Sequence, residues 1–481
     1  MDRLHRRDFL KLAAIGGATF AWESNSLAGA RSLAGTRPNI ILIMTDDQGY
    51  GELACHGNPI IKTPHLDQLH GQSIRFTDFH VSPTCSPTRA SLMTGRHEFR
   101  SGVTHTIHER ERLSLKATTI AQVLKAAGYA TGIFGKWHLG DQDEYQPDRR
   151  GFDEVFIHGA GGIGQTYPGS CGDAPGNTYF SPAILHNGTF VKTDGFCTDV
   201  FFAQAARWIE GQSKTDAPFF AYIVPNAPHG PYVCPDAYKK PYLDAGLRDA
   251  DAAYYGMITN IDDNVGRLLH DLTQWDLDRR TLVIFLTDNG HARGNLYNAG
   301  MRGSKGGPYQ GGTRVPAFFR WTGTLPAGVD IDKLTAHIDL FPTLAQLAGA
   351  KIPGTVRLDG RSLVPLLQDP NSDWPDRYIF VHQGRWDKGM AAQSKYRNCA
   401  VRNSRFRFVN NREFYDIRND PGEKTNVIAQ HPEVVAKMRR AYDQWWDEVL
   451  PAMENEDAVG PKVNPFKERY WKQFGGGPAE P

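Results

Sequence analysis

Apolar runs and amphipathic segments alternate along the first three quarters of the chain. Two short runs, 39–45 and 281–287, are apolar almost throughout, which is typical of strands buried on both faces of a parallel sheet. The same pattern predicts further strands at 129–134 and 219–224, and helices near 119–127, 198–210, 251–272 and 339–348. This alternation predicts an α/β fold with a large, mostly parallel sheet flanked by helices.

The pattern changes after Asp369. Short strand-like pieces at 378–382, 407–410 and 413–417 precede a helical pattern over 432–449. We therefore expect a first domain over residues 36–369 and a smaller C-terminal α+β domain over 370–481, with 461–481 as an irregular end. No internal repeat or heptad pattern is visible, which excludes solenoids and coiled coils.

One segment of the first domain, 159–195, is rich in Gly, Pro and Asn and has little periodicity. It is too long for a plain connection, so we expect a functional loop over the site. Loops of this kind usually determine which substrate is bound.

Composition describes an ordinary globular protein. The chain has 481 residues, 40% of them hydrophobic, and a formal net charge of +1. This balance gives no general reason to expect nucleic acid or an anionic membrane as a partner, so any preference for anions must be local. No segment after the amino end offers about 18 consecutive apolar residues, so we expect no stable membrane span in the mature protein.

The amino end resembles an export signal. Arg6 and Arg7 precede a short apolar stretch over 12–21, and the small residues 28–30 offer a cleavage site. This pattern is typical of a twin-arginine signal, which predicts the twin-arginine export machinery as a partner and a periplasmic or secreted bacterial protein. The alternative is a solvated basic arm before a buried helix. We exclude residues 1–30 from the fold.

Metal-binding side chains follow the two apolar runs directly. The first run ends in Asp46 and Asp47, and the second ends in Asp288 and Asn289. Because sites of open α/β sheets lie at the carboxyl ends of the strands, we expect these four side chains to meet. Their hard oxygen donors suit Ca²⁺ and, less well, Mg²⁺. The competing interpretation is a pair of turns with helix caps.

Two motifs between these runs resemble a known family. The stretch from Cys85 to Arg96 reads Cys85-Ser86-Pro87-Thr88-Arg89 and then ASLMTGR, and the stretch 128–138 reads GYATGIFGKWH. Both resemble the type I, formylglycine-dependent sulfatases of the alkaline phosphatase superfamily, and the resemblance extends over most of the chain. It implies an alkaline phosphatase-like fold and a maturation enzyme that oxidises Cys85 to an aldehyde.

The resemblance also implies a mechanism. The aldehyde at Cys85 would be hydrated, and one hydroxyl, bound to the cation beside the four oxygen ligands, would attack the sulfur of a sulfate ester. After the alcohol leaves, deprotonation of the second hydroxyl would expel sulfate and restore the aldehyde. A helix beginning at Cys85 would add its positive end to the charge that stabilises the anion.

The remaining roles come from the same resemblance. Arg89 and Lys136 would hold the modified residue, and His138 would take the proton from its second hydroxyl. His229 would act as general acid for the leaving group or as a sulfate ligand, and Lys305 would bind sulfate. Neutral imidazole can accept a proton near pH 7.

These observations predict an exported sulfatase that acts on a sulfated carbohydrate or another organic sulfate ester. One alternative is a formylglycine-dependent phosphonate or phosphodiester hydrolase of the same superfamily. Another is a catalytically silent protein that binds glycans or metal ions through an unmodified Cys85. The polar segment 105–110 either contacts a sugar or forms a solvated turn.

Six cysteines do not define the scaffold, since five remain once Cys85 is modified. Cys171 and Cys197 flank a loop-rich segment and could pair after export, but their spacing does not fix the connectivity.

Overall fold

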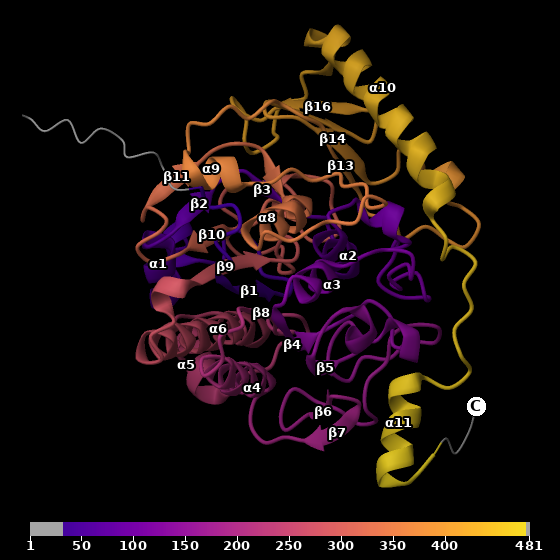
Figure 1. The fold of residues 1–481 in the computed structure, drawn as a ribbon. Coiled ribbons are helices and arrows are strands. Elements are labelled where there is room, and N and C mark those ends of the chain that lie inside the picture. Colours follow the sequence, from indigo (N-terminus) through magenta and orange to yellow (C-terminus); the bar gives the residue numbers. More distant parts are fainter. Residues whose placement is uncertain (1–31, 478–481) are drawn as a thin grey trace, which may run out of the picture. The chain divides into compact units, whose positions relative to one another are not determined.

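A ten-stranded sheet forms the centre of the protein (Figure 1). The structure is a computed structural model that describes residues 32–477. The strand order is β11-β2-β10-β9-β1-β8-β4-β5-β6-β7, and the five strands from β9 to β5 run parallel to one another. The predicted α/β architecture with a mostly parallel sheet is therefore confirmed.

The strands of this sheet are β1 (Asn39–Thr45), β2 (Ile74–Phe76), β4 (Ala130–Lys136), β5 (Glu154–His158), β6 (Ala183–His186), β7 (Thr189–Lys192), β8 (Phe219–Val224), β9 (Thr281–Thr287), β10 (Ala317–Arg320) and β11 (Val329–Ile331). A two-stranded sheet pairs β3 (Phe79–His80) with β12 (Thr335–Ala336). The helices are α1 (Pro64–Gly71), α2 (Cys85–Thr94), α3 (Ile120–Ala126), α4 (Cys197–Gln212), α5 (Asp236–Asp244), α6 (Asp249–Gln274), α7 (Gln310–Thr313), α8 (Leu340–Leu347), α9 (Val364–Gln368), α10 (Pro432–Val449) and α11 (Pro465–Phe474).

Helices cover both faces of the large sheet, which explains why its central strands are apolar throughout. In β1, Ile40 and Leu42 belong to one apolar core with residues of α2, α3 and α8, whereas Ile41 and Ile43 belong to another core with residues of α1, α4 and α6. Successive side chains of a strand point to opposite faces, so both faces of β1 are buried.

A separate antiparallel sheet lies in the C-terminal part of the chain. It contains β13 (Ile379–His382), β14 (Cys399–Arg402), β15 (Phe406–Val409) and β16 (Glu413–Asp416) in that order. Its apolar face packs with Trp445 and Trp446 of α10. The helix has the predicted bounds, whereas β14 was missed. Residues 33–477 belong to one compact unit, and the division at residue 369 stays a prediction.

The prediction that segment 159–195 is loop throughout is wrong. Its second half contains β6 and β7, an antiparallel hairpin that extends the large sheet at one edge. The hairpin turns at Asn187 and Gly188, which both have positive φ (48° and 86°). Asn-Gly is the residue pair that two-residue hairpin turns favour, so this sequence signal was available.

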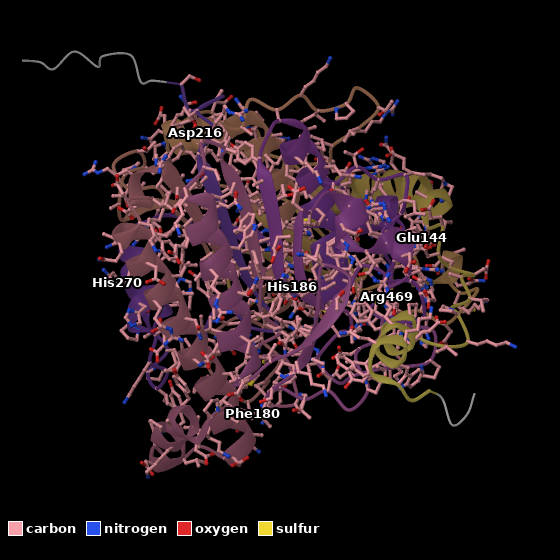
Figure 2. All side chains as sticks on the ribbon, turned by 60° about the horizontal axis from the view of Figure 1, so that its bottom comes forward. Glu144, Phe180, His186, Asp216, His270 and Arg469 are labelled. Atoms are coloured by element: carbon pink, nitrogen blue, oxygen red, sulfur yellow. The ribbon has the colours of Figure 1, made fainter. Side chains whose placement is uncertain are left out.

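The predicted irregular end is also wrong, because it contains helix α11. The side chain of Asn464 caps this helix by accepting hydrogen bonds from the backbone N–H groups of Phe466 and Lys467. Phe466 is buried and packs edge-on against Phe190 of β7. Figure 2 shows Arg469 of α11 near the segment of Glu144, and its guanidinium is ion-paired with the neighbouring Asp143.

The predicted export signal lies outside the described residues. Within residues 32–477, no helix is both long enough and apolar enough to cross a membrane. All six cysteines fall inside this range and all are free, so Cys171 and Cys197 are not paired. They have different surroundings: Cys197 packs in the apolar core with Phe201, whereas the backbone N–H of Cys171 donates to Glu111 Oε1 at 2.6 Å.

Candidate active site

The carboxyl ends of the parallel strands β1, β9 and β4 bring together five of the predicted residues: Asp46, Asp47, Asp288, Asn289 and Lys136. Thr45 of β1 is in register with Thr287 of β9, so Asp46 and Asp288 follow their strands at the same level. The pairing continues past the strands, since the backbone N–H of Asp288 donates to Thr45 O at 3.0 Å. Lys136 is the last residue of β4, and its Nζ lies 2.5 Å from Asp46 Oδ2.

Cys85 lies in this cluster as the first residue of α2. Its Sγ and one carboxylate oxygen from each of Asp46 and Asp288 all lie within 4.8 Å of one another. Thr84 precedes the helix in an extended conformation and its side chain makes no capping hydrogen bond. The partially positive end of the helix is therefore adjacent to Cys85 and not satisfied by a side-chain cap.

Each carboxylate of the cluster has one basic partner. Lys136 is paired with Asp46, Lys305 Nζ lies 2.6 Å from Asp47, and Arg89 Nη2 donates to Asp288 Oδ2 at 3.0 Å. All of these groups except Lys305 are almost completely buried. Their ion pairs are thus shielded from bulk water. Inside the protein, such pairs are stronger than surface pairs, but removal of one partner costs more free energy.

Burial raises the pKa of all three carboxyls, but nearby positive charge reverses the net shift at Asp47. Burial raises the pKa of Asp46 to about 6, although Lys136 opposes the shift. Burial and the charge of Asp46 raise the pKa of Asp288 above its usual range. For Asp47, burial is outweighed by Lys305 and His229, which hold its pKa below the usual range. Two of the three carboxyls therefore lack enough nearby positive charge to ionise as readily as in water.

Buried oxygen atoms without partners lie in the same place. Asp46 Oδ1 and Asn289 Oδ1 have no hydrogen-bond partner within the described residues. The Asn289 amide donates through Nδ2 to Asp47 Oδ1 and to Gly290 O, both at 3.0 Å, which leaves its oxygen for another ligand. Carboxylate and amide oxygens with unmet demand for positive charge fit a Ca²⁺ or Mg²⁺ ion.

The positive charges also act on Cys85. Burial alone would raise the pKa of its thiol, but Lys136 and Lys305 outweigh it and the pKa lies below the usual value. A thiol in such an electropositive setting differs from the inert buried cysteines elsewhere in the chain, whose pKa values burial raises, as at Cys197.

Two histidines complete the site. His229 Nδ1 donates to Gly230 O at 2.7 Å, and Nε2 lies 3.7 Å from Asp47 Oδ2. His138 Nε2 donates to Thr106 O at 2.9 Å, and its buried Nδ1 has no partner among the described residues. Burial, followed by the charges of Lys136 and Arg89, holds the pKa of His138 well below its usual value, so this ring is neutral.

The first part of segment 159–195 packs on these histidines. A Cβ atom added to Gly161 would lie 3.1 Å from His138 Cε1, and one added to Gly162 would lie 3.0 Å from His229 Nδ1. The hydroxyl of Tyr179 donates to His229 O at 2.8 Å. These contacts place Gly161, Gly162 and Tyr179 against the two histidines, although the segment is not a loop throughout.

Sequence reasoning missed several neighbours of the site. His158 ends β5 in register with Lys136, and neither of its buried ring nitrogens has a partner within the described residues. Tyr254 of α6 donates to Asp47 O at 2.8 Å. The position of His158 at the carboxyl end of a strand was a usable signal, but β5 itself was not predicted. No local pattern marks Tyr254.

Comparison with known proteins identifies the family. Residues 38–350 match the family described as "Sulfatase". The chain belongs to the sulfatase family. Residues 305–446 also match the description "N-sulphoglucosamine sulphohydrolase, C-terminal". The family and its named members make this sulfatase a hydrolase of sulfuric esters.

Two curated relatives illustrate the similarity. Arylsulfatase A of Homo sapiens is 32% identical over 473 residues, which cover 86% of this sulfatase and 89% of the relative. N-acetylgalactosamine-6-sulfatase of Mus musculus is 30% identical over 433 residues, covering 82% and 79% of the two chains.

Two solved structures extend the comparison. Ps i-CgsB in complex with k-i-k-neocarrahexaose has a TM-score of 0.78 and 28% identity, and the match covers 91% of this sulfatase and 97% of that chain. The phosphonate monoester hydrolase of Agrobacterium radiobacter has a TM-score of 0.57 and 21% identity over 87% and 96% of the chains. The second likeness concerns the fold alone.

Proposed function

We infer that this sulfatase removes sulfate from carbohydrates after export, with Cys85 converted to formylglycine and a divalent cation bound by Asp46, Asp47, Asp288 and Asn289. The observation that carries the proposal is the cluster itself: a helix-terminal cysteine beside three carboxylates, each paired with a base. The twin-arginine pattern supports export to the periplasm or beyond.

The four oxygen ligands favour Ca²⁺ over Mg²⁺. Their unpartnered oxygens and the raised pKa values of Asp46 and Asp288 are features that an added positive charge would relieve. When bound, the cation would supply positive charge that favours ionisation of a hydroxyl and attracts sulfate oxygens.

The setting of Cys85 supports its modification. The sequence around it keeps Pro87 and Arg89, and the charges of Lys136 and Lys305 lower the pKa of its thiol. When formed, the hydrated aldehyde would supply one hydroxyl for attack on sulfur and a second one whose ionisation releases sulfate.

His138 is suited to accept a proton. Its Nε2–H donates to the carbonyl of Thr106, so in the neutral ring the lone pair is on Nδ1, which has no partner within the described residues. Burial keeps the ring neutral. We assign His138 as the base for the second hydroxyl of the modified Cys85.

His229 is suited to act on the leaving oxygen. Its Nδ1–H donates to Gly230 O, so Nε2 is the atom that exchanges a proton with the substrate. Burial lowers the pKa of His229 below its usual value, and the charge of Asp47, 3.7 Å away, opposes this shift. We assign His229 as the general acid, with binding of a sulfate oxygen as the alternative role.

Arg89, Lys136 and Lys305 supply fixed positive charge. Arg89 holds two partners at once, Asp288 Oδ2 and Lys136 O, and so fixes the end of β4 against the cluster. Lys305 is the most exposed of the three, with a side chain 20% exposed, and we assign it to the sulfate oxygens. Charge that is already in place when the leaving oxygen becomes negative stabilises the transition state.

The proposed substrate is a sulfated carbohydrate. Relatives of this chain include an enzyme named for N-acetylgalactosamine 6-sulfate, and a structural neighbour was solved in complex with k-i-k-neocarrahexaose. Exported enzymes also meet polymer-derived substrates more often than cytosolic metabolites. An aryl sulfate would serve as an activated surrogate.

Parallel assays on an aryl sulfate and an aryl phosphodiester test the reaction class. We expect sulfate release to be the faster reaction, and Lys305→Gln to reduce its kcat/KM by about 100-fold. Lys240→Gln, at an exposed lysine paired with Asp244, is the matched control and should leave it unchanged. Faster phosphodiester turnover would favour the phosphorus hydrolase, and no turnover of either ester would favour the binding protein.

A further inference from the structure

A cavity outside the catalytic cluster lies beside the loop that supports His138. It has a volume of about 380 Å³. Its lining residues come from three segments that are distant in sequence. They lie within 105–110, within 385–388 after β13 and within 456–460 after α10, and Gly169 adds to them. We call it the Arg385 cavity.

One residue connects this cavity to the catalytic histidine. Thr106 accepts a hydrogen bond from His138 through its carbonyl oxygen at 2.9 Å, and its hydroxyl accepts another from Arg385 Nη2, also at 2.9 Å. The wall of the Arg385 cavity and the proposed base therefore share Thr106.

Cationic donors in the Arg385 cavity lack acceptors. Arg110 is only 4% exposed; its Nε and Nη1 are hydrogen-bonded, but Nη2 has no partner among the described residues. Arg385 bonds Thr106 through Nη2, and its buried Nε is likewise without a partner there. Buried polar groups are nearly always hydrogen-bonded, so each of these guanidinium groups retains one donor for a further acceptor.

Two of the three carboxylates that line the cavity already have partners. Glu456 accepts hydrogen bonds from Arg110, Trp386 Nε1 and the Thr104 hydroxyl. Glu109 is paired with Arg112 at 3.1 Å and accepts from Gln142. The third carboxylate, Asp387, is exposed, as is Lys388, whose Nζ donates to the backbone oxygen of Asp457 at 3.4 Å.

The backbone of this cavity is strained in a way typical of binding sites. His108, Glu109 and Arg385 are not glycines, yet their φ values are 67°, 60° and 56°. Non-glycine residues in the left-handed region cost free energy and cluster where function requires a particular side-chain direction.

A second cavity of about 380 Å³ shares Glu109 and Gly169 with the first. Its lining residues come from the loop 166–170, from the chain between α10 and α11, and from α11 itself. Figure 1 shows the course of the chain from α10 to α11. The lining of the second cavity includes two aromatic rings, Tyr167 and Trp471, and two lysines, Lys462 and Lys467. Aromatic faces bind the apolar faces of sugar rings, and lysines bind their anionic groups.

We propose that the Arg385 cavity binds a second anionic group, sulfate or carboxylate, of the same sugar chain that presents its sulfate ester to Cys85, and that the adjoining cavity holds the next sugar. This inference rests on the proposed function. On this proposal, the enzyme prefers an anionic oligosaccharide to a monosaccharide sulfate. The residues that determine this selectivity are Arg110, Arg385 and Lys388.

Equilibrium binding of two hexasaccharides tests this proposal. The first is a carrageenan hexasaccharide, in which all anionic groups are sulfates, and the second is a hyaluronan hexasaccharide, in which all are carboxylates. The full-length protein carries Cys85→Ala, so that no turnover disturbs the measurement. We expect at least one of them to bind, and Arg385→Gln and Lys388→Gln each to raise its Kd about tenfold. The hexasaccharide whose Kd rises in these variants identifies the bound anion as sulfate or carboxylate.

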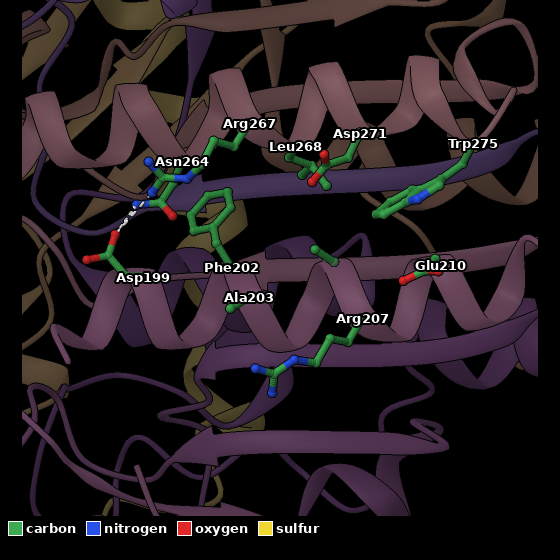
Figure 3. Close-up of a pocket in the computed structure, with 11 residues that line it drawn as sticks. Asp199, Phe202, Ala203, Arg207, Glu210, Asn264, Arg267, Leu268, Asp271 and Trp275 are labelled. Atoms are coloured by element: carbon green, nitrogen blue, oxygen red, sulfur yellow. Dashed lines mark hydrogen bonds and ion pairs between the residues drawn. The ribbon is translucent and has the colours of Figure 1, made fainter. Parts of the chain in front are cut away.

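The matched control is Arg207→Gln. Arg207 lines a cavity of about 420 Å³ between α4 and α6 (Figure 3), whose lining residues include none of the catalytic cluster. Its substitution should leave Kd within about twofold. In the active enzyme, which carries the matured Cys85 and not Cys85→Ala, Lys388→Gln should leave kcat/KM for the aryl sulfate unchanged, since that small ester does not reach the cavity.

Two results would overturn the proposal: no binding of either hexasaccharide, or an unchanged Kd in both the Arg385→Gln and the Lys388→Gln variants. Failure of the proposed function would give a different result. In that case, the enzyme from its native host would not turn over an aryl sulfate. Binding that depends on Arg385 without such turnover would retain the anion site and reject the hydrolase mechanism.

Discussion

The protonation state of a buried carboxyl away from the site depends on its surroundings, and Glu111 is the clearest case. Its Oε1 accepts a hydrogen bond from the backbone N–H of Cys171, whereas its buried Oε2 has no partner within the described residues. Burial raises the pKa of Glu111 to about 8, from an ordinary value of 4.5. The carboxyl is therefore protonated in the folded protein at pH 7, while the unfolded chain has it ionised.

This difference makes folding depend on pH. The contribution of Glu111 to stability is complete below pH 4.5 and is lost as the pH rises towards 8, at about 1.4 kcal/mol per pH unit. Glu111→Gln removes the titration, so its free energy of unfolding should fall less than that of the wild type between pH 5 and pH 8 in urea titrations. The exposed Glu144 is the control, and Glu144→Gln should behave as the wild type does. Equal pH dependence of Glu111→Gln and wild type would contradict this account.

Among the elements, β4 passes β8 without room for a side chain at the point where the site begins. Gly135 has a φ of 123°, and a Cβ atom there would lie 2.0 Å from Val224 O of β8. The next residue, Lys136, is the partner of Asp46. The close contact of these two strands thus sets where the lysine enters the cluster.

Gly135→Ala should therefore move the end of β4 and reduce both stability and activity. Gly188→Ala is the matched control, because Gly188 also has a positive φ, 86°, but faces open space. We expect the control to lose about 1 kcal/mol and to retain its activity. Thermal unfolding and aryl sulfate turnover measure the two effects. Equal losses in both variants would show that backbone strain, and not the strand contact, is what matters.

For the protein as a whole, the proposed cation would link the site to stability. The cluster joins β1, β9, β4 and α2, so a ligand that binds only the folded protein stabilises all of them together. Burial raises the pKa values of Asp46 and Asp288, so a bound cation would favour the ionised form of both carboxyls.

Removal of Ca²⁺ with a chelator should accordingly lower Tm and abolish turnover, and added Ca²⁺ should restore both. Asp46→Asn should lose the Ca²⁺-dependent rise in Tm. Asp262→Asn is the control: Asp262 is also a buried carboxyl with a raised pKa, about 7, but it accepts from the backbone N–H groups of His65 and Leu66, away from the cluster. A rise in Tm that Asp46→Asn retains would place the ion elsewhere.

The sequence predicted those parts of the molecule that depend on local pattern. Strands β1, β8 and β9 were readable because both of their faces are buried, and the meeting of Asp46 and Asp47 after β1 with Asp288 and Asn289 after β9 followed from this. The hairpin β6–β7 and helix α11 were missed although Asn187-Gly188 and the Asn464 cap were readable, because their surroundings are rich in Gly and Pro. Contacts such as Gly161 with His138, or Thr106 with Arg385, join residues far apart in the chain and leave no local signal.

The most direct test of the central claim is the mass of the tryptic peptide from Phe76 to Arg89, taken from protein exported by its native host. This peptide contains Cys85 and no other cysteine. The account predicts a mass lower than that of the unmodified peptide by the difference between a CH₂SH and a CHO group, or the mass of the corresponding hydrate. An intact thiol in protein that turns over sulfate esters would contradict the proposed nucleophile.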